Sequence, residues 1–397
     1  MDILKVKELA AKYANKVVEY RHHLHRHPEL SFHEYRTSAY ISKFLLENGI
    51  TFKSGIAGNG ILAIIEGVKP GNTVALRADI DALPITEQND CAYKSQNLGV
   101  MHACGHDVHT SSLMGTALIL NELKNEFSGK ILLIFQPAEE KLPGGAKQML
   151  KEGIFNEHKP DVILAQHVNS SMQAGTVGFK SGMYMASTDE IYLTVKGKGG
   201  HAAMPHQITD TVLIASNIIV ALQQIVSRKT FAAIPTVLSF GKFIADGATN
   251  IIPDEVKIEG TFRTMNENWR KEALAQIKFM SQNIAITMGA KCDVKIINGY
   301  PSLINDDKIT QRVKFLSEQY LGKENVIDID IRMTAEDFSY FAQIYPATMY
   351  RLGTAGTIEN TKSLPHSSHF DIDESVMQMS HGLMAWIAIQ LAKNNEQ

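Results

Sequence analysis

The chain has 397 residues, of which 44% are hydrophobic and 20% are charged, and its formal net charge is -3. A chain of this length exceeds one ordinary hydrophobic core, so two domains are predicted. The composition is typical of a globular protein, and the sequence has no basic patch of the kind that nucleic-acid-binding proteins carry.

Targeting segments and cysteines bear on where the protein works. Residues 1–27 have the pattern of a charged amphipathic helix and lack the continuous apolar core of a signal peptide. The most apolar later stretch, 212–226, is interrupted by four polar residues, so no membrane span is predicted. Three widely spaced cysteines imply no disulfide framework. We expect a soluble cytoplasmic enzyme, with neither membrane nor nucleic acid among its partners.

Short apolar runs that end in polar residues recur along the chain. Strands are predicted within 73–84, 130–140, 161–168 and 348–354, and a helix over 109–126. This alternation predicts an α/β fold with a mixed, mostly parallel sheet flanked by helices. In such sheets, functional groups collect just past the carboxyl ends of strands. The residues at such positions are Asp79, Asp81, Glu139, Glu140 and His167.

The order of predicted strands and helices changes between residues 185 and 297. The predicted elements there are a strand at 190–197, a helix at 208–227, strands at 235–243 and 255–264, a helix at 267–289 and a strand at 292–298. This βαββαβ order is that of a ferredoxin-like domain. The α/β pattern then resumes and includes a final helix through 377–393. We therefore expect an inserted domain at 185–297 within a domain formed by 1–184 and 298–397.

The stretch HACGHD at 102–107 places Cys104 and His106 two residues apart before a predicted helix. A helix start stabilises a thiolate, which is the form of cysteine that binds metal. The spacing alone favours a buried, inert cysteine over a metal ligand.

Glu139 and Glu140 follow a predicted strand that we expect to be central. One carboxylate of such a pair can bind a metal while its neighbour acts as a general base, although a Glu pair is also common in solvated turns. His167 and His369 stand at further strand or loop ends and are candidate ligands. The convergence of these residue types favours a metal site.

A second group of histidines precedes or follows Pro28. Its members are His22, His23, His25, His27 and His33. Because Pro28 ends any helix there, these side chains need not converge, and no metal role is assigned to them.

Nine motifs, in this order, resemble the M20 metallopeptidases, specifically the amidohydrolase subgroup of hippurate hydrolases and auxin-conjugate (IAA-amino acid) hydrolases. They are HRHPELSFHEYRT, LRADIDALP, MHACGHDVHT, FQPAEE, GGHAAMPH, NIIP, TFRT, MTAEDFSYF and LPHSSHFDID. The resemblance covers nearly the whole chain. It implies two metal ions in the larger domain and a smaller domain that acts as a lid and dimerisation surface.

The resemblance also implies the metal ligands. Cys104 matches the ligand that replaces the bridging aspartate of other family branches. His106, Glu140, His167 and His369 match the remaining ligands. Sulfur favours zinc, whereas the carboxylate and imidazole ligands also suit manganese, cobalt or nickel.

Other residues are assigned by the same resemblance. Glu139 matches the general base, and Asp81 matches an acid beside the site that is not itself a ligand. His201 resembles the histidine that reaches a partner subunit's active site and supports the oxyanion. Asn250 and Arg263 resemble residues that hold the free carboxylate of the substrate.

The resulting prediction is a metal-dependent amidohydrolase that cleaves N-acyl-L-amino acids, of the N-acetyl or N-benzoyl type, with a metal-activated water. An N-acetyl-diaminopimelate deacetylase and a small-dipeptide peptidase are alternatives of the same fold. A non-catalytic metal- or peptide-binding protein is an alternative of another class, and the spare carboxylate of Glu139 argues against it. A redox sensor that pairs Cys104 with Cys91 also stays open. A homodimer, or a tetramer of dimers, is expected through the lid.

Overall fold

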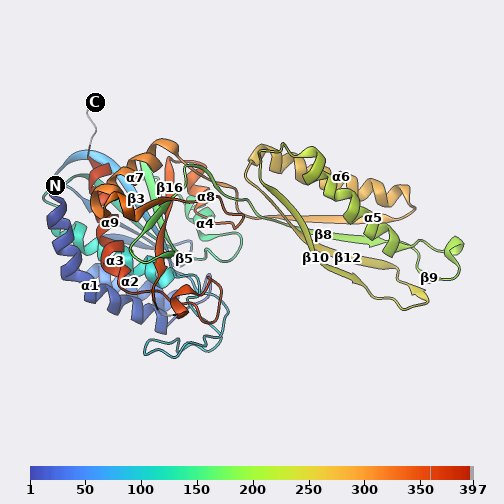
Figure 1. The fold of residues 1–397 in the computed structure, drawn as a ribbon, viewed down its shortest axis with the longest axis horizontal. Helices are drawn as coiled ribbons and strands as arrows, with labels where there is room; N and C mark the ends of the chain where they lie inside the picture. Colours follow the sequence, from blue (N-terminus) through green and yellow to red (C-terminus); the bar gives the residue numbers. More distant parts are fainter. Residues whose placement is uncertain (358, 394–397) are drawn as a thin grey trace. The chain divides into compact units, whose positions relative to one another are not determined.

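The computed structural model describes residues 1–357 and 359–393. The chain forms two compact units (Figure 1). The larger unit comprises Met1–Gly182, Ile304–Asp330 and Asp337–Gln397, and the inserted unit comprises Met183–Leu303 and Ile331–Glu336. Residues 331–336 join the inserted unit because Ala186 N donates hydrogen bonds to the carbonyl oxygens of Arg332 and Thr334, both at 3.1 Å. The sequence pattern had placed that segment with the carboxyl-terminal part of the larger domain.

The larger unit is built on an eight-stranded sheet with the order β1-β2-β4-β3-β5-β16-β6-β15. Its strands are β1 (Thr51–Ile56), β2 (Gly60–Glu66), β3 (Lys69–Asp79), β4 (Ser128–Gln136), β5 (Val162–Gln173), β6 (Val177–Phe179), β15 (Val326–Asp328) and β16 (Ala347–Ala355). Strand β3 is parallel to both β4 and β5, and β5 is parallel to β16, whereas β1 and β2 form an antiparallel edge. The prediction of a mixed, mostly parallel sheet flanked by helices is confirmed.

Five helices share one apolar core with this sheet. They are α1 (Ile3–Arg26), α2 (Tyr35–Glu47), α3 (His106–Leu123), α7 (Asp307–Leu321) and α9 (Val376–Ala392). Val74, Leu76 and Ala78 alternate along β3 and all lie in this core, as expected for one face of a pleated strand. Helices α3 and α9 are buried almost all round, which explains why neither has a polar face.

Shorter elements complete the larger unit. Helices α4 (Gly145–Lys151) and α8 (Ser339–Ala342) contact each other. The ring centroid of Phe341, in α8, lies 5.8 Å from that of Phe155, which follows α4. Strands β7 (Gly182–Met185) and β14 (Leu303–Asn305) lie where the chain passes from one unit to the other.

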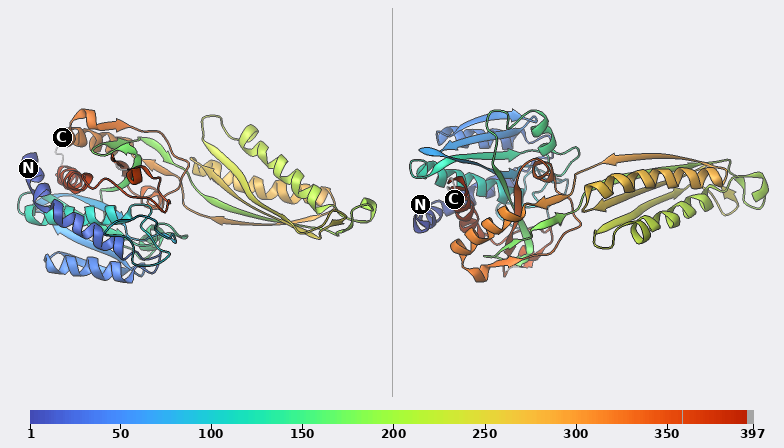
Figure 2. Two further views of the ribbon diagram at one scale, coloured as in Figure 1. Left: turned by 60° about the horizontal axis from the view of Figure 1, so that its bottom comes forward. Right: turned by 90° about the horizontal axis from the view of Figure 1, so that it is seen from above.

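The inserted unit has the element order that its sequence predicts. A four-stranded antiparallel sheet has the order β10-β12-β8-β13 and one helical layer, which is the ferredoxin-like arrangement. Its elements are β8 (Asp189–Lys196), α5 (Thr211–Gln224), β10 (Thr236–Ala245), β12 (Glu255–Thr264), α6 (Glu267–Thr287) and β13 (Lys291–Asn298). Figure 2 shows α5 and α6 side by side on one face of this sheet. A short ribbon of β9 (Gly200–His201) and β11 (Ile251–Ile252) extends from it.

Among the described residues, one helical segment, Thr211–Lys229, is long and apolar enough to cross a membrane. Ile214, Ile218 and Leu222 of this segment are buried in the core of the inserted unit.

Candidate active site

The central strands of the larger unit deliver acids and histidines to one edge of the sheet. Strand β3 ends at Asp79 and β4 ends at Gln136, and the two strands are parallel and in register at these residues. His167 stands in β5, opposite Arg351 of β16. Because parallel strands end at a common edge, groups that are far apart in the sequence meet there.

The turn before α3 depends on a glycine. Gly105 has a φ of 80°, in the left-handed region, and a Cβ atom there would lie 2.5 Å from Val168 Cγ2. Only glycine meets both requirements without strain. This tight turn presents Cys104 and His106 from either side, and the Cys104 Sγ lies 3.6 Å from His167 Nε2. Burial raises the pKa of the Cys104 thiol, and the charge of Glu140 adds to the effect.

Two buried histidines keep one ring nitrogen for a ligand. His106 Nδ1 lies 2.9 Å from the carbonyl oxygen of Asp81 and 3.2 Å from Asp81 Oδ1. His167 Nδ1 lies 2.9 Å from the carbonyl oxygen of Val168. In the neutral ring with Nδ1–H donating, Nε2 offers the lone pair that a metal binds. Burial, reinforced by the charge of Arg351, holds the pKa of His167 well below its usual range.

His109, which received no role from the sequence, has no nitrogen left for a metal. Its Nδ1 donates to Asp79 Oδ1 at 2.6 Å, and its Nε2 accepts from the Val168 backbone N–H at 3.0 Å. Arg77 Nη1 donates to the other carboxylate oxygen of Asp79 at 2.6 Å. Burial opposes ionisation of Asp79, but Arg77 and the neighbouring imidazoles hold its pKa well below the usual range. His109 and Asp79 therefore lie next to the candidate ligands and are held in place by hydrogen bonds.

Asp81 is occupied in the same way. Its Oδ2 accepts hydrogen bonds from Ser31 Oγ at 2.6 Å and from the Glu140 backbone N–H at 3.0 Å, while Oδ1 faces His106. The carboxylate thus fixes His106 and the start of the Glu140 loop together.

The two glutamates after β4 face the same imidazole. Glu139 Oε2 and Glu140 Oε1 lie 4.0 Å and 3.9 Å from His106 Nε2. Glu139 is 6% exposed, so it is shielded from bulk water. The pair therefore lies in the ligand cluster rather than in a solvated turn.

The structure brings His366, and not His369, to this cluster. His366 Nε2 lies 3.2 Å from Glu140 Oε1, and its backbone N–H donates to the carbonyl oxygen of Ala103 at 2.7 Å. His369 instead has its Nδ1 3.2 Å from Ser368 Oγ. The segment is irregular, so no helix or strand periodicity indicates which of the two histidines turns inward.

Among the described residues, five groups of three side chains could hold a metal ion, and two of these groups share Cys104. Cys104, His106 and His167 offer atoms within 4.8 Å of one another, and so do Cys104, Glu140 and His366. His106 Nε2 is buried without a hydrogen-bond partner in the described part of the chain. Such an atom is costly unless something binds it, and a divalent cation would satisfy it. The sulfur, nitrogen and oxygen donors therefore fit divalent metal ions.

The remaining predicted residues lie in the inserted unit. His201 of β9 pairs with Ile251 of β11, and the carbonyl oxygen of Asn250 accepts from the Ala202 N–H at 3.0 Å. His201 and Asn250 are thus close neighbours, and both are exposed. Arg263 stands in β12, half-buried, and its Nη1 donates to the carbonyl oxygen of Met333 at 3.1 Å.

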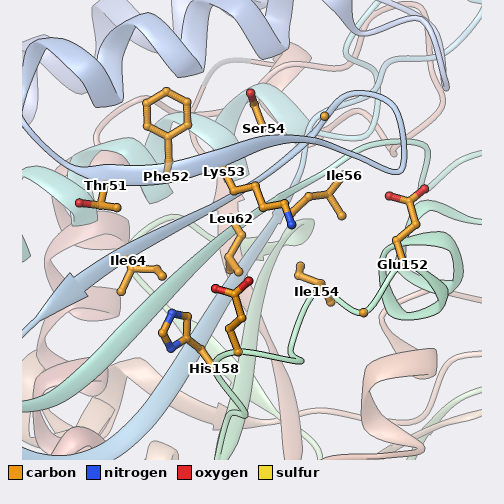
Figure 3. A pocket seen from close by; sticks show the side chains of 13 residues that line it. Thr51, Phe52, Lys53, Ser54, Ile56, Leu62, Ile64, Glu152, Ile154 and His158 are labelled. Atoms are coloured by element: carbon orange, nitrogen blue, oxygen red, sulfur yellow. The ribbon is translucent and has the colours of Figure 1, made fainter.

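A pocket of about 300 Å³ lies elsewhere in the larger unit, at the β1–β2 edge of its sheet. Figure 3 shows Lys53 of β1 beside Leu62 of β2, with Glu152 and His158 on the segment after α4. None of the candidate metal ligands lines this pocket.

Comparison with known proteins identifies the family. Residues 75–388 match the model of "Peptidase family M20/M25/M40". The chain is 37% identical over 401 residues to the N-acetyl-L-cysteine deacetylase of Bacillus subtilis, covering 100% of this chain and 94% of that protein. It is 40% identical over 304 residues to the N-acyl-L-amino acid amidohydrolase of Geobacillus stearothermophilus, covering 77% of this chain and 82% of that protein.

A solved structure agrees over nearly the whole chain. The YXEP protein of Bacillus subtilis, described as a dinuclear metal binding peptidase from the M20 family, superimposes with a TM-score of 0.83 at 31% identity. The match covers 96% of this chain and 99% of that one. The chain belongs to peptidase family M20/M25/M40, and it is a metal-dependent amidohydrolase.

Proposed function

We propose that this enzyme hydrolyses the amide bond of N-acyl-L-amino acids and releases a carboxylic acid and a free amino acid. The observation that carries the proposal is the pair of donor groups that share Cys104, with the further carboxylate of Glu139 beside them. A protein that only binds metal needs the ligands but has no use for a second buried carboxylate as a proton acceptor. The activities that the names of two relatives describe, on N-acetyl-L-cysteine and on N-acyl-L-amino acids, support the substrate class.

The ligand set follows from the two groups. His106 and His167 would hold one ion, Glu140 and His366 the other, and Cys104 both. His366 takes the place that the sequence assigned to His369. Divalent ions held by these residues would supply Lewis-acid chemistry, because they would lower the pKa of a bound water and polarise the amide carbonyl.

Glu139 is the proton carrier in this proposal. Its carboxylate takes the proton of the attacking water as the new C–O bond forms at the amide carbon. The C–N bond then breaks, and Glu139 passes the proton to the departing amine nitrogen. The low exposure of Glu139 keeps competing water from its carboxylate.

The inserted unit supplies the remaining groups. We assign His201 to the oxyanion, and Asn250 and Arg263 to the free carboxylate of the substrate. A hydrogen-bond donor that faces the oxyanion lowers the activation free energy by about 3–4 kcal/mol. A bidentate arginine suits a carboxylate, which favours an amino acid over a neutral amine as the leaving group.

We further propose a homodimer through the inserted unit, in which His201 of one protomer serves the site of its partner. Strand β10 is an edge strand, and it exposes Phe243 and Ile244, while α5 exposes Val220. Exposed edge strands with apolar side chains pair readily with a second chain.

Cys91, Cys104 and Cys292 are all free thiols, which supports a reducing, cytoplasmic compartment.

The test is amine release from a panel of N-acetyl, N-benzoyl and longer N-acyl amino acids. The panel also includes N-acetyl-diaminopimelate and small dipeptides. The protein is reconstituted with zinc, manganese, cobalt or nickel, and a chelator-treated sample is the control. Chelator-sensitive turnover of an N-acyl amino acid is the expected result, and the best acyl group assigns an acetyl-type or a hippurate-type enzyme. Turnover of dipeptides alone would overturn the proposed substrate class.

A further inference from the structure

Helix α1 contains a buried arginine that the proposed chemistry does not use. The Arg21 side chain is 1% exposed, and its three guanidinium nitrogens contact three different carboxylates. Nε lies 3.1 Å from Asp107 Oδ2, Nη2 lies 2.5 Å from Asp371 Oδ1, and Nη1 lies 2.6 Å from Glu374 Oε1.

These carboxylates belong to the two segments that carry the candidate ligands. Asp107 directly follows His106 in the first turn of α3. Asp371 and Glu374 follow His366 along the irregular segment before α9. One planar side chain thus joins two segments that are more than 250 residues apart in the chain.

Neighbouring groups hold the same two segments. His25 Nδ1 lies 2.9 Å from Asp107 Oδ2, and its Nε2 lies 3.2 Å from Glu87 Oε1. Asn89 Nδ2 donates both to Glu87 Oε1 at 3.1 Å and to the carbonyl oxygen of Phe370 at 3.0 Å. The histidines of the amino-terminal motif therefore include one, His25, that buttresses the Asp107 carboxylate.

The aromatic ring of Tyr93 completes the enclosure. Its hydroxyl donates to Asp371 Oδ2 at 2.8 Å, and the Arg21 Cζ lies 4.9 Å from the ring centroid. Both oxygens of Asp371 are thereby occupied, so the orientation of this carboxylate is fixed.

Stability alone does not explain such a network. Removing a guanidinium from water costs several kcal/mol, and buried ion pairs are often replaceable by apolar side chains without loss of stability. A planar fork with fixed donor directions does, however, set the separation of the groups it binds. Metal ligands need this kind of support, since they must be held to within about 0.5 Å of their working geometry.

We propose that Arg21 is a positioning residue for the dinuclear site: it clamps the start of α3 to the segment 366–374, so that His106 and His366 face the metal ions together. The inference rests on the proposed ligand set, in which His366 belongs to the second ion. It assigns a role to the amino-terminal helix, which contributes no ligand of its own.

The experiment compares Arg21→Lys with Arg270→Lys. Arg270 is a matched control because its side chain is 9% exposed and binds both oxygens of Asp189, at 2.7 and 2.8 Å, in the inserted unit. Cobalt(II) binding is measured by competition with a chromogenic chelator, and the visible spectrum of the loaded protein is recorded. Circular dichroism of the metal-free variants checks that both are folded.

We expect Arg21→Lys to weaken cobalt binding by about 10- to 100-fold, the usual effect of losing a group that supports a metal ligand, and to shift the visible bands. Arg270→Lys should leave both unchanged. Wild-type affinity and spectrum in Arg21→Lys would overturn the clamp. Equal weakening in both variants would also overturn it, since the effect would then be a general loss of stability.

Two further variants keep the test decisive. Asp371→Asn removes one arm of the clamp while Arg21 keeps Asp107 and Glu374, and it replaces Arg21→Lys if that variant does not fold. His366→Ala tests the ligand set directly. Normal cobalt binding by His366→Ala would show that the ligand assignment is wrong, whereas weak binding by His366→Ala with normal binding by Arg21→Lys and Asp371→Asn would reject the clamp alone.

Discussion

The two units of the chain hold their functional residues in opposite ways. In the larger unit the candidate ligands and their supports are mostly buried, and Asp79, Asp81 and His109 each use both of their side-chain polar atoms in contacts with neighbouring groups. In the inserted unit His201 and Asn250 are exposed, and their polar side chains face solvent. The candidate site of the larger unit is thus buried and held by hydrogen bonds, whereas the roles proposed for His201 and Asn250 would require contact with a substrate or a second chain.

The largest expected effect is in the larger unit. Glu139→Gln removes the proton acceptor but keeps the shape of the side chain, so kcat should fall by about 10³- to 10⁴-fold while two metal ions stay bound. Turnover is measured with the best N-acyl amino acid, and metal content by elemental analysis. Near-normal turnover would remove Glu139 from the role of base.

His201→Ala should cost about 10²- to 10³-fold in kcat, as expected for loss of an oxyanion donor, with no change in metal content. Loss of metal in this variant would contradict the separation of roles between the units.

Mixing inactive variants sharpens the same comparison. If His201 serves the partner's site, a heterodimer of Glu139→Gln and His201→Ala protomers has one intact site. Random exchange of protomers should then restore about a quarter of wild-type activity. If His201 acts within its own chain, the mixture stays inactive.

A smaller effect distinguishes the two histidines of LPHSSHF. His366→Ala should weaken binding of one ion by at least about a hundredfold, because removing a ligand costs more than removing a group that supports one. His369→Ala should bind both ions normally. Calorimetric titration of the metal-free proteins with zinc measures both, and the reverse result would restore the ligand that the sequence predicted.

The smallest effect concerns stability against pH. Burial opposes the charge of His25, but Asp107 and Glu87 outweigh it and raise its pKa from 6.5 to about 9. A pKa that is raised in the folded state stabilises the protein. This stabilisation is fully present when the pH is below 6.5, the pKa of the unfolded state, and it is lost as the pH rises through about 9. The unfolding free energy of the metal-free protein should therefore decline between pH 6.5 and 9, whereas His25→Gln should show a flatter profile.

Most of the fold and part of the site follow from local pattern. The apolar runs before Asp79, Glu139 and His167 predict parallel strands, and parallel strands bring their ends together without any knowledge of contacts. Cys104 and His106 follow from the tight turn at the start of α3.

What the sequence did not provide depends on contacts between distant segments. His366 lies beside Glu140, and its N–H donates to the carbonyl oxygen of Ala103, a contact between distant segments that no periodicity reveals. Arg21 reads as a charged residue of an amphipathic helix, since its carboxylate partners lie 86, 350 and 353 positions away. His109 could have been suspected only from its buried helix face.

Cys104, which belongs to both donor groups, has a consequence for how the enzyme binds its metal ions. If Cys104 binds both ions as proposed, the first ion would convert its thiol to the thiolate that the second ion also requires, and each ion would favour the binding of the other. Loading would then be cooperative rather than stepwise. In a cell where metal is scarce, the population would divide into molecules with both ions and molecules with none, and supply would set the number of working enzymes rather than the speed of each.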